Sequence, residues 1–325
     1  MNNTTKLEIN PSCPYTMPTN KIETHEFTEF CNFKLGVSPS KILADIERWL
    51  EEDHGSGDPT LFSALAKNKP VQFFIVAKQD FTLACKPVME QVFRHVSANE
   101  VEIFSDFKDG DNVKKGAVVI GGRGRAASVL LAERVSLNLG SKMSGVATKT
   151  KNILTEIRKY NQNIYLLETR KTTPGLRLYE KYSVRVAGAR NHRHALDGGA
   201  MLKENHLRSI GFMEDALLNL QNNLPILTKI EIEVTNLNEF RTALNLGADV
   251  IMLDNFSLED VKIAVAEKNR THPKVKLELS GNLDEKNISE IANSGVDYMS
   301  MGALIHKAIW VDMSLQIYSN FSETS

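Results

Sequence analysis

The chain has 325 residues, 42% of them hydrophobic and 24% charged, with a formal net charge of −1. This length allows one large domain or two ordinary ones, and the balanced charge excludes a global basic field, so an anion site has to be local. The three cysteines show no metal or disulfide spacing, no apolar run approaches the roughly 20 residues of a membrane span, and the N-terminus lacks the apolar core of a secretory signal, so we expect a cytoplasmic protein.

The first part of the chain predicts a polar arm followed by a mixed domain of helices and strands. Residues 1–36, which begin polar and contain several prolines, are assigned to the arm, and residues 37–143 to the domain. The spacing of apolar residues predicts helices over 40–52, 126–139 and 151–160, and strands over 71–76, 81–85, 101–104 and 117–120. For Gly121–Arg125, an ordinary turn before the helix is preferred to a loop that binds phosphate or RNA.

From residue 164 onward, strand-like runs alternate with helical patterns. The strands are predicted over residues 164–167, 200–202, 230–234, 250–253, 275–279 and 296–300, with helices over 238–246, 258–267 and 284–293 between the later ones. This βα repeat implies a parallel sheet with right-handed crossovers. With six or more units, we expect the sheet to close into a barrel.

The most informative segment is the loop Thr169–Arg177, which follows the first strand of this repeat. Arg170 and Lys171 place two adjacent cations where the strand ends, and Pro174-Gly175 forces a turn behind them. In α/β folds, ligands bind at the carboxyl ends of parallel strands. The loop therefore indicates an anion site, although a solvated basic loop is the simpler alternative.

The other strand ends carry residues whose chemistry divides into three kinds. Cations suited to carboxylates or phosphates are Lys203 and the preceding His192-Arg193. Glu233 and Asp254 are oxygen ligands suited to Mg²⁺. Small residues that let a phosphate approach the backbone follow the last two strands: Ser280-Gly281-Asn282 and Met301-Gly302-Ala303. Because these ends share one rim in a parallel barrel, we expect a substrate with carboxylates, a phosphorylated sugar and a divalent ion.

Each of these residues also has an ordinary interpretation. Asp254 could cap a helix, Gly302 could form a tight turn, Glu233 could pair with a cation, and His192 could be satisfied within its own loop. Glu231 is expected to point to the face opposite Glu233. No dinucleotide fingerprint follows a strand, and no Ser/His/Asp arrangement is evident.

These residues resemble the quinolinate phosphoribosyltransferases, the decarboxylating enzymes that make nicotinate mononucleotide for NAD synthesis. The resemblance runs in order from about Glu133 to the C-terminus and continues more weakly back to about Asp58. The matching strings are Glu133-Arg134, Ser144–Thr148, Thr169–Arg177, Asn191–Arg193, Leu202–His206, Glu231–Val234, Leu253–Phe256, Ser280–Asn282 and Gly302–Leu304. The family usually has a threonine where this chain has Ile305, next to His306.

The resemblance implies a fold, an activity and residue roles. The fold is α/β, with an N-terminal α+β sandwich domain followed by an irregular TIM-like α/β barrel over residues 144–325, and the last helix of the chain is expected to pack back on the first domain. The activity joins quinolinate to phosphoribosyl pyrophosphate with Mg²⁺ as the cofactor. The partners are these two small molecules and a second copy of the chain, in a homodimer or higher oligomer.

The implied roles fall on two substrates. Quinolinate would be bound by Arg134 of the neighbouring subunit and by Thr169, Arg170, His192, Arg193 and Lys203. Phosphoribosyl pyrophosphate would be bound by Lys171, Glu233, Asp254, Ser280, Gly281, Asn282, Met301, Gly302, Ala303 and His306, with Glu233 and Asp254 holding Mg²⁺ directly or through water.

Three other classes of protein were weighed against this function. A related phosphoribosyltransferase with another acceptor disagrees with the intact Thr169–Arg177 string. A non-catalytic phosphosugar-binding protein would be expected to lack Glu233, Asp254 or Lys203, and all three are present. A nucleic-acid-binding module disagrees with the net charge and with the absence of a stripe of aromatic and basic residues.

Overall fold

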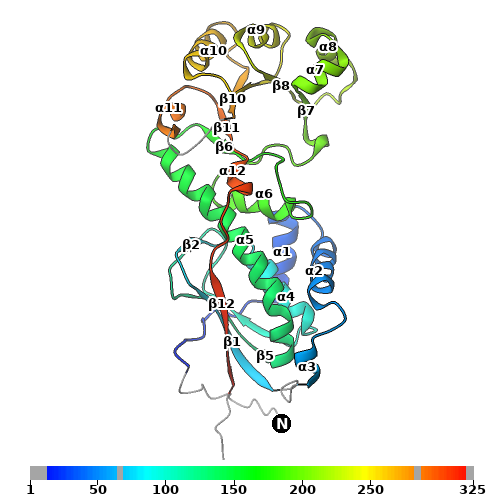
Figure 1. Ribbon diagram of the computed structural model, residues 1–325, viewed down its shortest axis with the longest axis vertical. Helices are drawn as coiled ribbons and strands as arrows, with labels where there is room; N and C mark the ends of the chain where they lie inside the picture. Colours follow the sequence, from blue (N-terminus) through cyan, green and yellow to red (C-terminus); the bar gives the residue numbers. More distant parts are fainter. Residues whose placement is uncertain (1–12, 64–68, 282–286, 320–325) are drawn as a thin grey trace, which may run out of the picture. The chain divides into compact units, whose positions relative to one another are not determined.

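Figure 1 shows the computed structural model, which describes residues 13–63, 69–281 and 287–319. Two compact units are formed, one by residues 1–148 and 309–325 and the other by residues 149–308. The chain passes between them inside helix α5 (Ala126–Arg158) and again after Ala308. The domain boundaries expected at 36/37 and 143/144 stay predictions. None of the described helices has the length and apolar character needed to span a membrane.

The first unit is built on an antiparallel sheet whose strands come from both ends of the chain. Its order is β12 (Met313–Ser319), β1 (Pro70–Ala77), β5 (Val118–Arg125) and β3 (Glu102–Phe104). A small second sheet pairs β2 (Phe81–Thr82) with β4 (Asn112–Val113). The element that returns to the first unit is thus strand β12, and not a helix as expected.

The helices of the first unit bury one face of this sheet. They are α1 (Thr24–Glu29), a π-helical turn (Phe30–Leu35), α2 (Pro39–His54), α3 (Pro59–Ser63), α4 (Lys86–Val96) and the first part of α5. Phe73 of β1 and Phe93 of α4 are fully buried and stack with their ring centroids 4.7 Å apart. Residues 24–35, which the sequence placed in the arm, are therefore helical.

The predicted turn at Gly121–Arg125 and the predicted gap between two helices are both absent. Glycines at these positions let neighbouring elements pack closely within a continuous strand and a continuous helix. Gly121–Arg125 belongs to strand β5, so the preferred turn is wrong. A side chain at Gly122 would overlap the ring of Phe73. The helices predicted over 126–139 and 151–160 are one helix, α5, in which Gly140 lies against Met89 and Gly145 against the backbone of Ile309. Glycine weakens a strand or helix on its own, but here it lets neighbouring elements approach.

The second unit contains a parallel sheet that confirms the predicted α/β class. Its order is β6 (Tyr165–Leu167), β11 (Tyr298–Ser300), β10 (Lys276–Ser280), β9 (Val250–Asp254), β8 (Ile230–Val234) and β7 (Ala200–Leu202). Beyond β6, Leu167 makes one further parallel bridge to Arg190. In the described part of the chain, no pairing joins β6 to β7, so the sheet is barrel-like and is not closed by hydrogen bonds.

Helices follow the strands as the repeat predicts (Figure 1). They are α6 (Arg177–Val186), a 3₁₀ turn (Leu196–Gly198), α7 (Glu204–Ile210), α8 (Met213–Asn223), α9 (Leu237–Asn245), α10 (Leu258–Thr271), α11 (Ile288–Ala292) and α12 (Ala303–His306). The side chains of Asn236 and Ser257 accept backbone hydrogen bonds at the starts of α9 and α10. Ser257 therefore caps α10, which leaves Asp254 free of the capping role.

The register of the parallel sheet gathers carboxylates on one face. Glu233 lies opposite Met252, and Met252 lies opposite Glu278. Residues two apart on a strand point to the same side, so Glu231 shares the face of Glu233, and the expectation that it points the opposite way is wrong. The alternate positions are buried and apolar, as at Ile232, Leu253 and Leu277. One face of the sheet is thus an apolar core and the other is polar.

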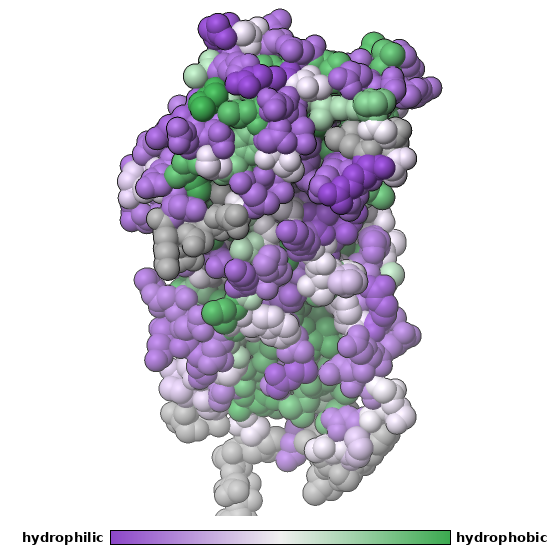
Figure 2. Space-filling model, turned by 45° about the horizontal axis from the view of Figure 1, so that its top comes forward, coloured by the Kyte–Doolittle hydropathy of each residue, from purple (hydrophilic) through white to green (hydrophobic). Residues whose placement is uncertain are grey.

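The surface is ordinary for a folded chain. Hydrophilic residues cover most of the face drawn in Figure 2, and hydrophobic residues show through in separate patches. The most exposed large apolar side chains among the described residues are Ile226, Leu227, Ile309, Phe33 and Phe212. Scattered exposed apolar residues of this kind are normal in soluble proteins.

The glycines of β5 give a test of the first unit. We expect Gly122→Ala to destabilise this unit by about 1–3 kcal/mol, because the new methyl group overlaps the Phe73 ring and the carbonyl of Glu102. Gly124→Ala on the same strand is the matched control, because its methyl group would meet the ends of two valine side chains, Val101 at 3.2 Å and Val129 at 3.5 Å, and no ring or backbone atom within these contacts. Calorimetry should show a lower melting temperature for the first variant, and equal temperatures would contradict this packing.

Candidate functional site

A buried ion pair lies directly behind the basic loop. Glu168 follows strand β6, Lys181 lies on α6, and both side chains are fully buried. Their charged atoms are in contact, and Lys181 also donates to the carbonyl of His192 at 3.1 Å. Breaking such a pair leaves an uncompensated buried charge, which costs about 3–5 kcal/mol. The pair therefore fixes the end of β6 against α6.

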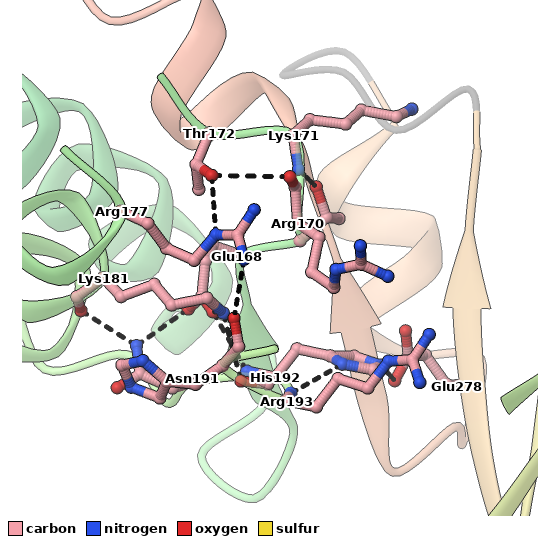
Figure 3. Close-up of polar contacts among 12 residues, drawn as sticks. Glu168, Arg170, Lys171, Thr172, Arg177, Lys181, Asn191, His192, Arg193 and Glu278 are labelled. Atoms are coloured by element: carbon pink, nitrogen blue, oxygen red, sulfur yellow. Dashed lines mark hydrogen bonds and ion pairs between the residues drawn. The ribbon is translucent and has the colours of Figure 1, made fainter. Parts of the chain in front are cut away.

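The same pair also holds the loop that carries His192 and Arg193. Asn191 donates to Glu168 at 2.9 Å and to the carbonyl of Lys181 at 2.8 Å. The backbone N–H of His192 donates to Glu168 at 3.1 Å. Two segments that follow different elements are thus tied to one carboxylate, which brings the predicted cations into one region (Figure 3).

Three of the predicted quinolinate ligands point the same way. Figure 3 shows the side chains of Arg170, His192 and Arg193 directed toward the strand that carries Glu278, whereas Lys171 points in a different direction. Arg193 donates from Nη1 to the carbonyl of Gly199 at 2.8 Å, and its buried Nε has no partner among the described residues. Burial and the neighbouring charge of Arg170 both lower the pKa of Arg193. Two guanidinium groups close enough to repel each other favour an anion between them.

His192 is already bonded to the protein through both ring nitrogens. Its Nε2 lies 3.0 Å from Glu231 and 3.7 Å from Glu278, and its Nδ1 accepts the backbone N–H of Arg193 at 2.7 Å. Burial opposes protonation of the ring, but the two carboxylates outweigh it and raise its pKa. His192 is thus satisfied by its own surroundings, as its ordinary interpretation proposes.

A second group joins the acidic residues to two lysines. Lys203 follows β7 and contacts Glu233 of β8 in an ion pair. Burial and the charge of Glu233 raise the pKa of Asp254 at the end of β9, while Lys203 and Lys171 lower it in part. Glu233 therefore pairs with a cation, as its ordinary interpretation held, and it also acts on Asp254. This cluster has the oxygen donors that suit a hard divalent cation.

The glycine-bearing strand ends lie beside this cluster. Ser280 is opposite Asp254 in the register, and Asn255 donates its backbone N–H to Ser280 at 3.0 Å and its side chain to Asp254 at 2.9 Å. Gly281 has φ of +81° and leaves no room for a side chain beside Asn255. At Gly302, an added Cβ would lie 3.0 Å from Lys171, 3.2 Å from Thr169 and 3.3 Å from His306.

The remaining predicted residues lie outside the contacts described above. Asn282 lies outside the described residues. Met301 is buried and donates its backbone N–H to Leu167 at 2.9 Å, and Ala303 begins the short helix α12. Arg134 is exposed on α5 in the first unit, so its part in a shared site remains a proposal.

The described residues contain one group of three potential metal ligands. His192, Glu231 and Glu278 offer ligand atoms that all lie within 4.8 Å of one another. This group differs from the predicted pair Glu233 and Asp254. Since the Nε2 edge of His192 faces both carboxylates and its Nδ1 accepts an N–H, the geometry is that of a hydrogen-bonded histidine.

Sequence reasoning missed the residues that support the site from behind. Glu168 and Lys181 were not singled out, and Glu231 was assigned to the wrong face. Glu278 interrupts the apolar run 275–279, and a charged residue within a buried strand could have marked it. Lys181 lies in an amphipathic helix and gives no comparable signal in the sequence.

The comparisons with known proteins identify the family of the chain. The model of the quinolinate phosphoribosyl transferase N-terminal domain matches residues 58–144, and that of the C-terminal domain matches residues 146–316. A probable nicotinate-nucleotide pyrophosphorylase (carboxylating) of Synechocystis is 36% identical over 87% of this chain and 95% of its own. The rat nicotinate-nucleotide pyrophosphorylase (carboxylating) is 32% identical over 87% of this chain and 93% of its own.

Solved structures give the same result. The crystal structure of NadC from Streptococcus pyogenes has a TM-score of 0.82 and 34% identity, covering 87% of this chain and 98% of its own. The nicotinate-nucleotide pyrophosphorylase from Francisella tularensis has a TM-score of 0.76 and 34% identity, covering 94% of this chain and 100% of its own. With both domains matched and relatives aligned over nearly their full length, the chain belongs to the quinolinate phosphoribosyltransferase family.

Proposed function

We propose that this chain transfers the phosphoribosyl group of phosphoribosyl pyrophosphate to quinolinate, and releases pyrophosphate and CO₂ to give nicotinate mononucleotide for NAD synthesis. The observation that carries the proposal is the presence of two chemically different environments in the second unit. One holds the guanidinium groups of Arg170 and Arg193, and the other holds Glu233 and Asp254 with two lysines.

Quinolinate suits the first environment because it is a planar dianion. Arg170 and Arg193 repel each other in the free protein, and the buried Nε of Arg193 lacks a partner among the described residues. A guanidinium group binds a carboxylate with two parallel hydrogen bonds, so each of the two carboxylates can take one arginine. Thr169 supplies a hydroxyl, Lys203 adds a donor when its present partner yields to substrate, and His192 lies beside Arg193 in the same region.

Phosphoribosyl pyrophosphate suits the second environment. Glu233 and Asp254 have the oxygen donors that Mg²⁺ prefers, and this ion neutralises charge on the departing pyrophosphate when it is bound. Lys171 points away from the quinolinate cations and lies against Gly302, as does His306. We assign the phosphate groups to Lys171, His306 and the backbone around Gly281 and Gly302, with Ser280 beside them; Asn282, Met301 and Ala303 are the weaker members of this proposed set.

The reaction then needs few protein groups that change their bonds. The pyridine nitrogen attacks the anomeric carbon, and the bond to pyrophosphate breaks with its electron pair on the leaving oxygen. Positive charge develops on the ribose, and carboxylates nearby stabilise it. The C2 carboxylate departs as CO₂ and leaves its electron pair on C2, where the adjacent cationic ring nitrogen stabilises the resulting ylide. One proton at C2 completes nicotinate mononucleotide.

The first prediction concerns selectivity between pyridine acids. Nicotinate has a single carboxylate, so it leaves one of the two guanidinium groups without a partner. We expect kcat/KM for nicotinate to be lower than that for quinolinate by on the order of 100-fold or more. Pyrophosphate release by the purified chain with Mg²⁺ measures both. Equal rates for the two acids would contradict this assignment of Arg170 and Arg193.

The second prediction concerns the divalent ion. Asp254→Asn should raise the Mg²⁺ concentration needed for half-maximal rate by on the order of 10-fold, because a carboxylate ligand is lost. Asp215→Asn, an exposed change on α8, is the matched control. Because burial and Glu233 raise the pKa of Asp254, its protonated form persists to higher pH than for an ordinary aspartate, so the Mg²⁺ requirement of the native chain should increase as pH falls. A requirement unchanged by the substitution or by pH would argue against this ligand.

The third prediction tests a homodimer with shared sites, in which Arg134 of one subunit reaches the quinolinate of the other. Arg134→Ala and Lys171→Ala should each be inactive, and a mixture of the two should recover up to about a quarter of native activity, because half of the dimers are mixed and each has one intact site. The control mixes Lys171→Ala with the double variant, which has no intact site. Absence of recovery, with subunit exchange confirmed by mass spectrometry, would contradict a shared site.

A further inference from the structure

The polar face of the parallel sheet holds two carboxylates that no substrate role uses. Glu278 lies in the middle of β10 with a side chain that is 2% exposed, and Glu231 lies in β8 with a side chain that is 11% exposed. One oxygen of each is buried without a hydrogen-bond partner among the described residues. Burying a carboxylate costs free energy unless the group is paired, so the burial of these two residues requires a structural explanation.

Their other oxygens both face one nitrogen. Nε2 of His192 lies 3.0 Å from Glu231 and 3.7 Å from Glu278. On the opposite edge of the ring, the backbone N–H of Arg193 donates to Nδ1 at 2.7 Å. A backbone N–H can only donate, so Nδ1 has to accept, and the hydrogen of the ring is on Nε2. The imidazole is thus a bridge with a fixed direction, from the Arg193 backbone to the two carboxylates.

We infer that Glu231 and Glu278 are positioning residues that hold His192 and, through it, set the backbone and guanidinium of Arg193 toward substrate. This role deepens the proposed function and rests on it. The charge of Glu231 also acts on Arg193, so the same carboxylate serves both neighbours. Partners that fix the tautomer and direction of a histidine commonly change affinity about 10–100-fold when they are removed.

The charge balance of the group supports this role. Burial and the charge of Glu231 raise the pKa of Glu278 to about 8, so Glu278 favours its protonated form at neutral pH. Lys203 and Ser300 also act on Glu278, and both lower its pKa. Protonation of Glu278 lowers the negative charge beside His192 and Arg193, which preserves the site's attraction for a dianion.

The direct test reads the histidine ring itself. The full chain labelled with ¹⁵N-histidine is compared as native protein, Glu231→Gln and Glu278→Gln, with His192→Gln to assign the signal. At a pH where the ring is neutral, we expect native His192 to carry its hydrogen on Nε2 with slow exchange, and that exchange to become faster in each variant. Glu267→Gln on α10 is the matched control for the same change at a residue that pairs with Arg241 away from the site. Native His192 with its hydrogen on Nδ1, or unchanged exchange of the Nε2 hydrogen in both variants, would overturn the inference.

Kinetics supply the second readout. In both variants the KM for quinolinate should rise on the order of 10-fold while the KM for phosphoribosyl pyrophosphate changes less than about 2-fold, because only the arginine side is displaced. Equal changes in both constants would overturn the positioning role. One equivalent of ZnCl₂ should leave the native Nε2–H signal in place, and its loss would mean that the three side chains form a metal site instead. If the native chain fails to turn over quinolinate, the proposed function is wrong, and the spectra still decide the arrangement of His192.

Discussion

The arrangement of the second unit depends on one buried ion pair, Lys181 with Glu168. It joins α6 to the end of β6, and through Asn191 and His192 it also holds the following loop. A carboxylate that is fully buried has to be satisfied in all directions, so the segments that donate to it cannot move independently. Arg170 follows one of these segments and Arg193 follows the other. The pair therefore holds in one region two cations that repel each other.

The parallel sheet adds the opposite charges by a simple rule of geometry. Residues two apart on a strand share a face, and neighbouring strands in register extend that face sideways. Glu231, Glu233 and Asp254 reach the polar face in this way, and Glu278 lies in the same row as Glu233. Some of these carboxylates are paired with lysines or with His192, which limits the cost of burying them. The second unit thus presents cations for one substrate and carboxylates for the other.

The strand ends were predictable from the sequence because apolar runs with short polar breaks mark parallel strands strongly. Glu233, Asp254, Ser280 and Gly302 were placed by that pattern. The continuous helix α5 and the glycine-containing strand β5 were not, because Gly122, Gly140 and Gly145 are explained by partners distant in the sequence. Lys181 could not be found for the same reason. Its importance comes from a contact with Glu168, and charge on an amphipathic helix usually faces water. Glu231 could have been placed correctly from the sequence, because residues two apart on a strand share a face, but it was predicted to point away from Glu233.

The central claim is that Arg170 and Arg193 form the binding site for a planar dianion. A crystal structure of the chain with quinolinate tests it most directly. The account predicts that the two carboxylates lie within about 3 Å of these two guanidinium groups, with the ring nitrogen facing Glu233 and Asp254. Quinolinate bound with both arginines free, or with its nitrogen turned away from the acidic pair, would contradict it.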